Sequence, residues 1–269
     1  MKVPMYSLDG EIISQIELPK QFYEEIRDDL IKRAALSVLS KTHQPYGTDP
    51  LAGKRQGKAW PKRRRKFGTT YGKGISRVAR KRLWRRGAQI GWVGARGAQT
   101  VKGIKAFPPK VNKIFEEEIN KKENKKAIRS ALAACANLEK VGAKHKIKLT
   151  AVPIVVEDKI EEVNKTREIY KILKNLGLKD ELKRIKEKKI RPGKGKMRGR
   201  KYKTKAGPLI IVSKPCKLEL SARNLVGVDV CQINFLNAAL LAPGAQAGRL
   251  TIWSKAALEK LEKEKLFIK

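Results

Sequence analysis

Leu209-Ile210-Ile211-Val212 decides the fold of this chain, because it is a run of four apolar residues that no polar residue interrupts. Such a run is typical of a strand that is buried on both faces of a parallel sheet. Similar runs stand at 151–156, 226–230 and 250–253. We therefore expect these four segments to be neighbouring strands.

Segments with a helical apolar period separate the expected strands. Two of them, 163–176 and 178–188, lie between the first and second runs. Asn234 can cap a short helix that Pro243 stops, and Ser254 can cap a final one. Alternation of this kind predicts an α/β fold with a mainly parallel sheet and helices around it.

The N-terminal half of the sequence contains a long span without any pattern. Residues 11–18 alternate like a short strand, and Pro19 is expected to open a helix. A helical period returns only in a second region that starts at Pro108 and Pro109 and runs to about residue 138, with a polar break at 121–126. The patternless span between them is typical of a functional loop or a disordered segment.

Positive charge is concentrated in two segments. Lys41 to Lys105 contains 19 Lys or Arg residues and one acid, Asp49, while Lys188 to Lys205 contains 10 basic residues and no acid. These segments account for 28 of the net charge of +37. They repel themselves and need a dense array of anions, such as nucleic acid phosphates, to become ordered. We expect one α/β domain over 1–269, with an extended basic loop at 41–107 and a second basic loop at 188–206.

Residues for catalysis or metal binding are sparse. Cys135, Cys216 and Cys231 lie far apart without a CxxC pair, which favours small buried thiols over a zinc site or disulfides. His43 is expected at a solvated helix end, and His145, flanked by lysines, on the surface. We therefore expect no catalytic residue, no metal and no enzymatic activity.

Two glycine-containing stretches resemble nucleotide-binding motifs only superficially. Residues 68–74 miss the P-loop spacing by one position and have Gly74 where Ser or Thr is required, and residues 191–199 lack the third glycine of the dinucleotide motif. The first ten residues contain no apolar run like a signal peptide, and no stretch approaches a membrane span. We expect a soluble cytoplasmic protein without a cofactor.

Aromatic side chains are interleaved with arginines in the first basic segment. Such aromatics can stack on unpaired bases, or they can hold the loop against its own domain, and for Trp84 and Trp92 both interpretations stay open. The lack of acids favours phosphate contact for the arginines. The predicted RNA-binding residues are Lys54, Arg55, Lys58, Trp60, Lys62, Arg63, Arg64, Arg65, Lys66, Lys73, Arg77, Arg80, Lys81, Arg82, Trp84, Arg85, Arg86, Arg96, Arg191, Lys194, Lys196, Arg198, Arg200, Lys201 and Lys203.

Five motifs, in this order along the chain, resemble the universal large-subunit ribosomal protein four family in its archaeal and eukaryotic branch. They are Ile128-Arg-Ser-Ala-Leu-Ala-Ala134, Val155-Val-Glu-Asp-Lys159, Arg191-Pro-Gly-Lys-Gly-Lys-Met-Arg198, Ala222-Arg-Asn224, and Leu241-Ala-Pro-Gly244 with Gly248-Arg249 and Ile252-Trp253. The resemblance covers nearly the whole chain. Because the basic extension of eukaryotic relatives is missing after Trp253, an archaeal source is expected.

The resemblance implies a structural component of the large ribosomal subunit that supports its assembly. Its partners would be 23S-type ribosomal RNA, neighbouring large-subunit proteins and, near the loop tip, the nascent peptide in the exit tunnel. No membrane association and no homo-oligomer are expected. Residues 62–86 and Lys194, Lys196, Arg198 and Arg200 would contact RNA.

A hypothesis for the mechanism follows from the charge distribution: the long loop is disordered in the free protein and becomes ordered as RNA forms around it. Two rival functions stay open. A DNA-compacting chromosomal protein would also be basic, and an RNA-modifying transferase would need a cofactor crevice at the carboxyl ends of the strands.

Overall fold

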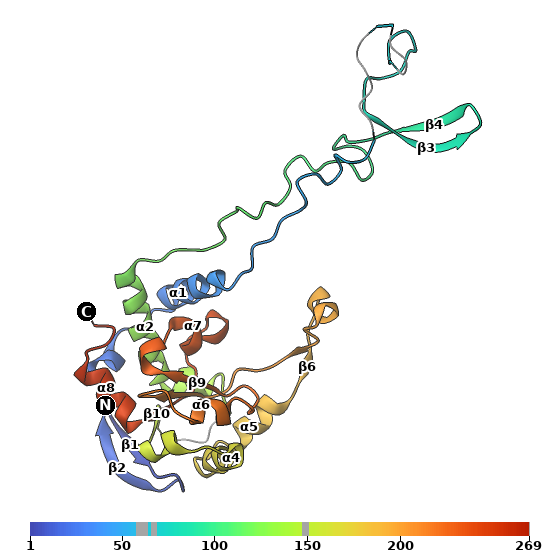
Figure 1. Ribbon diagram of the computed structural model, residues 1–269. Coiled ribbons are helices and arrows are strands. Elements are labelled where there is room, and N and C mark those ends of the chain that lie inside the picture. Colours follow the sequence, from blue (N-terminus) through green and yellow to red (C-terminus); the bar gives the residue numbers. More distant parts are fainter. Residues whose placement is uncertain (58–63, 66–68, 147–150, 269) are drawn as a thin grey trace. The chain divides into compact units, whose positions relative to one another are not determined.

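The computed structural model describes residues 1–57, 64–65, 69–146 and 151–268 (Figure 1). Contacts divide the chain into two compact units. The first, which we call the body, consists of Met1–Thr42 and Glu116–Lys269. The second, which we call the loop unit, consists of His43–Phe115. Among the described residues, no helix combines the length and apolar character that a membrane crossing requires.

Helices separate most of the successive strands of the body. In chain order they are β1 (Lys2–Tyr6), β2 (Ile12–Glu17), a 3₁₀ helix (Lys20–Tyr23), α1 (Asp28–Lys41), α2 (Lys121–Cys135), α3 (Leu138–Gly142), β5 (Ile154–Val156), a 3₁₀ helix (Asp158–Glu162), α4 (Thr166–Asn175), α5 (Lys179–Lys186), β6 (Lys189–Ile190), a 3₁₀ helix (Lys194–Arg198), β7 (Tyr202–Lys203), β8 (Leu209–Val212), α6 (Leu218–Ala222), β9 (Asp229–Gln232), a 3₁₀ helix (Ile233–Phe235), α7 (Ala238–Leu241), a 3₁₀ helix (Pro243–Ala245), β10 (Thr251–Ser254) and α8 (Lys255–Lys263).

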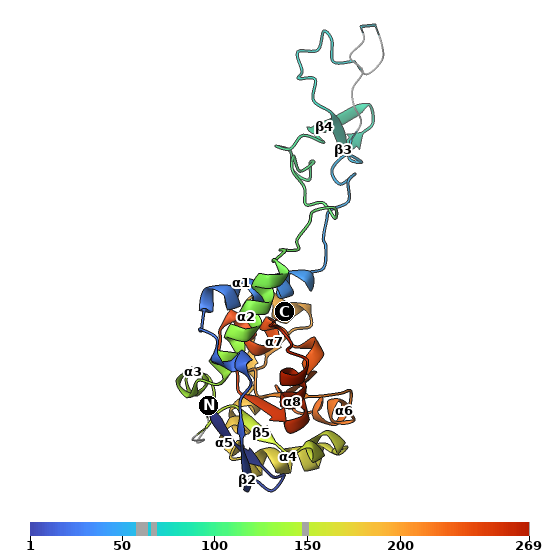
Figure 2. The same cartoon turned by 90° about the vertical axis from the view of Figure 1, so that its left-hand side faces the viewer.

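A six-stranded sheet with the order β2-β1-β5-β10-β8-β9 forms the centre of the body. The pair of β1 and β2 is antiparallel, and the other four pairs are parallel. The predicted mainly parallel α/β sheet is therefore confirmed, and the four apolar runs correspond to β5, β8, β9 and β10. Parallel neighbours require crossover connections, which is why helices cover both faces of the sheet (Figures 1 and 2).

Side chains along β8 alternate between two separate cores. Leu209 and Ile211 belong to the core under α1, α2, α7 and α8, where Trp253 is fully buried and meets the Phe22 ring edge to face, with ring centroids 5.4 Å apart. Ile210 and Val212 belong to the core under α4 and α6. This burial on both faces explains why the strand sequence contains no polar residue.

The prediction of a helix across residues 111–119 is wrong. The chain there has no helical structure, and α2 begins at Lys121, inside the stretch predicted to be a polar break. Tertiary contacts override the period: the Glu117 N–H donates to the Ser40 Oγ at 2.9 Å and the Glu117 carbonyl accepts from the Ser37 Oγ at 2.6 Å, so this backbone bonds to α1 instead of to a helix of its own. The polar residues 121–126 form the first turns of α2, where 121–122 are exposed and 123–126 are partly buried, and the core face of the helix begins at Ala127.

The first helix also starts later than predicted. Pro19 precedes a single 3₁₀ turn, and α1 begins at Asp28. Ser130 on α2 explains the delay, because its Oγ accepts from the Arg27 N–H at 2.6 Å and donates to the Glu25 carbonyl at 2.8 Å. These bonds hold the preceding residues extended and join α1 to α2, which lie side by side in Figures 1 and 2.

Of the two predicted helix caps near the C-terminus, one is confirmed. Ser254 caps α8 by accepting from the Ala257 N–H at 3.2 Å. Asn237 caps α7 instead of Asn234, since its side chain accepts from the Leu240 N–H at 2.9 Å. Residues 233–235 form a 3₁₀ turn before it.

The loop unit contains a hairpin that the sequence did not predict. β3 (Arg80–Arg86) and β4 (Gln89–Gly94) pair antiparallel, and a bulge interrupts the register between Arg82 and Trp84. The pattern of β3 is hidden because basic residues occupy five of its seven positions and most of them are exposed. Without a core beneath it, a strand needs no apolar alternation.

Two chain segments of the loop unit, 43–57 and 95–115, run side by side, and we call them the stem (Figure 1). The Thr48 to Pro109 bond joins the two segments, and an aromatic cluster of His43, Tyr46 and Phe115 packs across them. The Tyr46 and Phe115 rings are stacked with centroids 5.4 Å apart. His43 is exposed as predicted, although it contacts both rings.

Candidate RNA-binding surface

Cationic side chains are gathered along β3 of the loop unit. Arg80, Lys81, Arg82, Arg85 and Arg86 lie on this one strand. The Arg85 Nε donates to the Gly87 carbonyl at 3.0 Å, and the Lys81 Nζ donates to the Gln56 side-chain oxygen at 3.5 Å. Both of these partners are neutral, and Arg82, Arg85 and Arg86 are exposed, so the hairpin keeps positive charge at its surface.

Both hairpin tryptophans keep exposed ring surface, and Trp84 also packs within the hairpin. Trp84 lies opposite Gly91, and its indole covers that glycine so closely that a Cβ there would overlap the ring. The indole thus holds the hairpin together. Trp84 is nevertheless 51% exposed and Trp92 43% exposed, so each retains ring surface on which an unpaired base can stack.

Other predicted loop residues are cations whose side chains contact an aromatic ring or a backbone carbonyl. Arg64 and Arg77 lie over the Tyr71 ring, at 5.8 and 5.0 Å from its centroid. The Arg96 Nε donates to the Gln56 carbonyl at 3.3 Å. Arg55 is the exception, since it forms an ion pair with Asp49 at 2.9 Å. Arg65, Lys54 and Lys73 are exposed. Five predicted residues lie outside the described residues: Lys58, Trp60, Lys62, Arg63 and Lys66.

The second basic segment forms a small hairpin of its own. β6 pairs antiparallel with β7, and a 3₁₀ turn lies between them. Arg191 supports this hairpin, because its Nε and Nη2 donate to the carbonyls of Arg200 and Tyr202 at 3.1 and 3.4 Å. The remaining predicted residues are exposed around it: Lys194, Lys196, Arg198, Arg200, Lys201 and Lys203.

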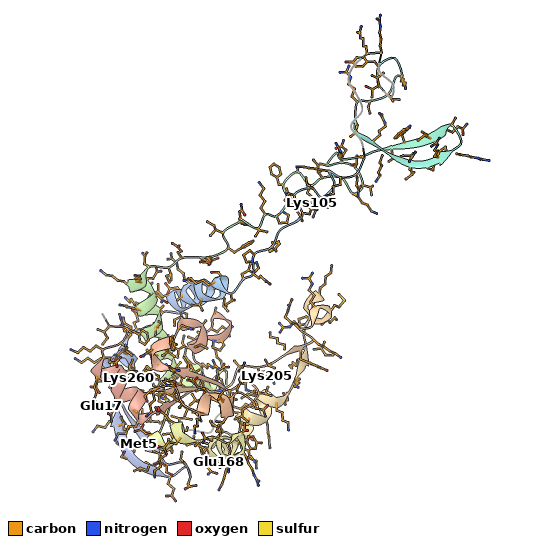
Figure 3. The ribbon with its side chains drawn as sticks, viewed as in Figure 1. Met5, Glu17, Lys105, Glu168, Lys205 and Lys260 are labelled. Carbon is orange, nitrogen blue, oxygen red and sulfur yellow. The ribbon has the colours of Figure 1, made fainter. Side chains whose placement is uncertain are left out.

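Paired charges mark the place where the second hairpin joins the body. Lys205, labelled in Figure 3, forms an ion pair with Glu187 at 2.7 Å. On the buried side, Arg184 on α5 donates to the Ala206 carbonyl at 2.8 Å and to both carboxylate oxygens of Glu181. The body therefore fixes both ends of the hairpin.

Glu181 is the centre of a buried polar cluster that the sequence analysis missed. Its side chain has no exposed surface and accepts hydrogen bonds from Arg184, from the His145 ring at 2.6 Å and from the Lys146 N–H at 2.9 Å. Burial alone raises the pKa of the Glu181 carboxyl, but these hydrogen bonds outweigh it and lower the pKa to about 2. Glu181 therefore stays ionised under all ordinary conditions.

The prediction that His145 lies on the surface is wrong, because its side chain is only 3% exposed. The flanking lysines suggested exposure, whereas the partner of the ring is distant in sequence. The Nε2 atom accepts a hydrogen bond from the Leu250 N–H at 3.2 Å, so Nδ1 carries the proton that is donated to Glu181. With both nitrogens engaged, the ring is a structural link and is not placed as a general base.

The carboxyl edge of the parallel strands, where a cofactor crevice would lie, is filled by a buried carboxylate. Glu161 accepts from the Ser213 N–H at 2.8 Å and from the hydroxyls of Ser213 and Ser254 at 2.9 and 2.7 Å. These serines directly follow β8 and end β10. The carboxyl ends of β8 and β10 are thus joined through Glu161, so protein groups occupy the place between these two strands where a cofactor would bind.

The cysteines behave as inert thiols in this fold. Cys135 and Cys231 are buried, and burial raises the pKa of their thiols to about 12 and about 11. Cys216 is half-buried, and burial again raises its pKa. The described residues contain no group of three or more His, Cys, Asp or Glu side chains that could hold a metal ion.

Comparison with known proteins places the chain in a family. Residues 16–264 match the model of the Ribosomal protein L4/L1 family. A protein of Nanoarchaeum equitans named "Large ribosomal subunit protein uL4" is 52% identical over 269 residues, which cover 99% of this chain and 100% of that protein. Proteins of the same name from Methanosphaera stadtmanae and Methanocaldococcus jannaschii are 47% and 46% identical, and each match covers 97% of this chain and at least 96% of the relative. This chain therefore belongs to the Ribosomal protein L4/L1 family, in its archaeal branch.

Proposed function

We propose that this protein is a structural component of the large ribosomal subunit in the cytoplasm and binds ribosomal RNA through the loop unit and the second hairpin. The observation that carries the proposal is the distribution of charge in a member of this family. Lys41 to Lys105 and Lys188 to Lys205 contain one acid for 29 basic residues. The body folds around its own core, so these cations are available for phosphates.

Binding would follow from counterion release. Each basic side chain that neutralises a phosphate displaces a condensed counterion, so the affinity falls as salt concentration rises. With about six to ten contacts, the affinity should fall by about three to five decades between low and moderate salt, on the scale known for duplex DNA. The exposed tryptophans Trp84 and Trp92 would add stacking on unpaired bases, which depends less on salt.

The loop unit supports a more specific role, which rests on the family resemblance. It would penetrate the ribosomal RNA and help to line the peptide exit tunnel, with the nascent peptide near its tip. The body would contact neighbouring large-subunit proteins and support subunit assembly. The stem is held by contacts among His43, Tyr46 and Phe115 and by the hydrogen bond to Pro109. We therefore expect the stem to be ordered before RNA binds. The hypothesis of a loop that is disordered in the free protein then applies only to the residues beyond the stem.

A deletion tests the division between body and loop unit. Replacing residues 48–100 by a short glycine-serine linker should leave cooperative melting intact, because the cores of the body contain no residue of that range. Affinity for ribosomal RNA should fall sharply in filter binding. Equal affinity of the deleted and full-length proteins would refute the proposed role of the loop unit.

A competition assay separates this proposal from a DNA-compacting function. The full-length protein is bound to labelled large-subunit ribosomal RNA and challenged with unlabelled RNA or duplex DNA at equal phosphate concentration. Ribosomal RNA should compete far better, because stacking requires unpaired bases. Equal competition by duplex DNA would favour a chromosomal protein instead.

A further inference from the structure

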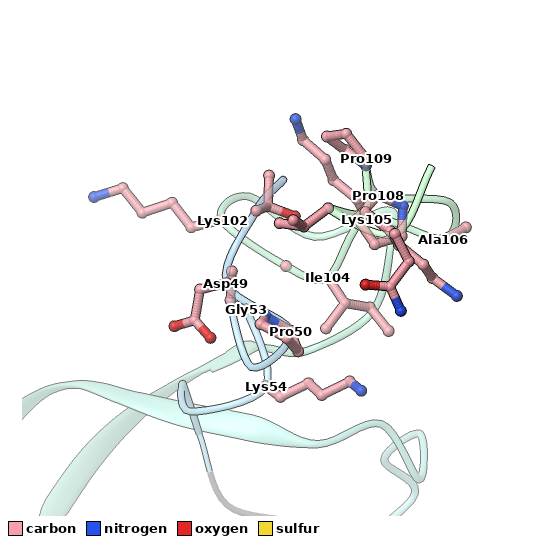
Figure 4. A pocket seen from close by; sticks show the side chains of 16 residues that line it. Asp49, Pro50, Gly53, Lys54, Lys102, Ile104, Lys105, Ala106, Pro108 and Pro109 are labelled. Atoms are coloured by element: carbon pink, nitrogen blue, oxygen red, sulfur yellow. The ribbon is translucent and has the colours of Figure 1, made fainter. Parts of the chain in front are cut away.

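A groove of about 770 Å³ lies within the stem of the loop unit, and none of its walls belongs to the body. Apolar side chains form its walls, and Figure 4 shows Pro50 and Ile104 at its centre. Pro108 and Val111 also line it. Its volume falls within the range of about 300–1,000 Å³ that is usual for sites of small ligands. We call it the stem groove.

The shape of the stem groove depends on a close approach of two glycines. Gly53 has a φ of +76° and lies so near Gly103 that an added Cβ would be 2.5 Å from the Gly103 carbonyl group. Any other residue at position 53 would push the two segments apart. The Thr48 to Pro109 hydrogen bond and the ion pair of Arg55 with Asp49 fix the same segments. The groove is thus formed by the protein itself.

Charge around the stem groove selects an anion. Four lysines line it: Lys54, Lys102, Lys105 and Lys110. Figure 4 shows Lys54, Lys102 and Lys105 extending in different directions around the apolar centre. Asp49 is the one acid in the lining, and it is already engaged, since Oδ2 pairs with Arg55 and Oδ1 accepts from the Leu51 N–H at 2.9 Å. No acid in the described part of the chain pairs with the four lysines.

We propose that the stem groove binds one unpaired nucleotide of RNA, with the base against Pro50 and Ile104 and the flanking phosphates at the lysines. This inference rests on the proposed RNA-binding function and adds a specific site to it. The flat faces of a base can pack against the proline and isoleucine side chains, and the lysines around the groove can neutralise the flanking phosphates. The groove would select unpaired nucleotides, because a paired base must first lose its pairing and stacking before it can enter.

Crosslinking of the full-length protein tests the occupant. The probe is large-subunit ribosomal RNA transcribed with a small fraction of thiouridine, and the crosslinked peptides and nucleotides are identified by mass spectrometry and sequencing. Peptides containing Ile104 and Pro108 should carry nucleotides from unpaired positions. Crosslinks of these peptides to paired nucleotides alone, or no crosslinks there, would overturn the proposal.

A filling substitution tests the groove itself. Ile104→Trp should remove the crosslink from the groove peptides and lower affinity about tenfold, which is the scale of one lost base contact. Ile114→Trp is the matched control, because Ile114 is an exposed isoleucine of the same unit that does not line the groove. The proposal fails if the two variants behave alike.

Substitution of the groove lysines is a second test, and its result does not depend on how an introduced tryptophan packs. Lys102→Gln with Lys105→Gln should lower the slope of log affinity against log salt by about 1.4, at about 0.7 for each contact with a single strand. Lys171→Gln with Lys183→Gln removes the same charge from exposed positions on α4 and α5, and this pair should leave the groove crosslink unchanged. If the control pair also lost the groove crosslink, the crosslink would depend on the net charge of the protein and not on the lysines of the groove.

The two proposals fail in different ways. If the unmodified protein does not bind ribosomal RNA at low salt, the proposed function is wrong. If it binds RNA but the groove peptides never crosslink, only the groove proposal is wrong. An acidic peptide could displace the crosslink at concentrations that leave the rest of the RNA bound. That result would assign the groove to a protein partner and refute the proposal that a nucleotide occupies it.

Discussion

Glu181→Gln is the substitution whose effect the structure predicts most sharply. Glu181 is fully buried and accepts from Arg184, His145 and the Lys146 N–H. Glutamine keeps the size of the side chain but removes the negative charge and one acceptor oxygen. Arg184, whose side chain is only 15% exposed, would be left without its counter-charge. Removing one partner of a buried pair is costly because the other charge stays desolvated.

The magnitude follows from the carboxyl pKa, which is about 2 in the folded protein against an ordinary value of 4.5. A difference of this size corresponds to about 3 kcal/mol of stability from the ionised group. The folded pKa is lowered, so this contribution is complete above the unfolded value and is lost as the pH falls toward 2. Glu181→Gln should therefore lower the free energy of unfolding by about 3 kcal/mol at neutral pH.

Urea unfolding of the variant and the unmodified protein, followed by circular dichroism at neutral pH and at about pH 3, measures this difference. The difference should shrink in acid, because the unmodified protein loses its advantage there. Glu187→Gln is the control, since Glu187 forms an exposed pair with Lys205 that should contribute at most about 1 kcal/mol. Equal losses for the two variants, or a difference that does not depend on pH, would refute the reasoning.

Three further predictions concern other parts of the molecule. Arg191→Ala should make the second hairpin sensitive to limited proteolysis, because Arg191 donates to two carbonyls of that hairpin, whereas Arg198→Ala should leave the digestion pattern unchanged and lower only the salt slope of RNA binding. Ser254→Ala should lower the unfolding free energy by about 1 kcal/mol or more in urea titrations, since Ser254 both caps α8 and donates to a buried carboxylate. In thiol labelling of the native protein, Cys216 should react first and Cys135 only on unfolding, and rapid labelling of Cys135 would contradict its burial.

The sheet could be predicted because burial on both faces is recorded in local composition. Leu209 to Val212 lies between two cores, so every position is apolar, and the run marks the strand without any knowledge of its neighbours. The capping of α8 by Ser254 is equally local. Features of this kind depend on residues that are adjacent in the chain, and the sequence shows them directly.

Features that depend on distant partners could not be predicted. His145 is buried because its ring forms hydrogen bonds with the Glu181 carboxylate and the Leu250 N–H, and neither residue is near it in sequence. The helical period after Pro109 has no effect, because the backbone of Glu117 bonds to Ser37 and Ser40 on α1. The hairpin of β3 and β4 has no core, so it lacks the alternation by which strands are recognised.

The candidate RNA-binding residues were predictable as a group but not in their individual roles. Charge density identifies the group, since a span of cations without acids needs an external anion. It cannot tell that Arg191 supports its own hairpin or that Arg55 is paired with Asp49, whereas Lys194 and Arg198 are exposed. No sequence pattern indicates the stem groove, because its lysines and prolines come together only where Gly53 approaches Gly103.

The way in which the basic segments hold their cations connects folding to binding. In the body, basic side chains such as Arg129 and Lys140 pair with carboxylates. In the two basic segments, Arg55 and Lys205 also pair with carboxylates, but other cations contact neutral groups: Arg77 lies over the Tyr71 ring, Arg85 donates to a carbonyl, and Lys201 lies over the Tyr202 ring. Ring faces and carbonyl oxygens position a cation without neutralising it. Local order is therefore obtained while the positive charge is kept for phosphate, and this arrangement explains how a segment with almost no acids can have defined structure.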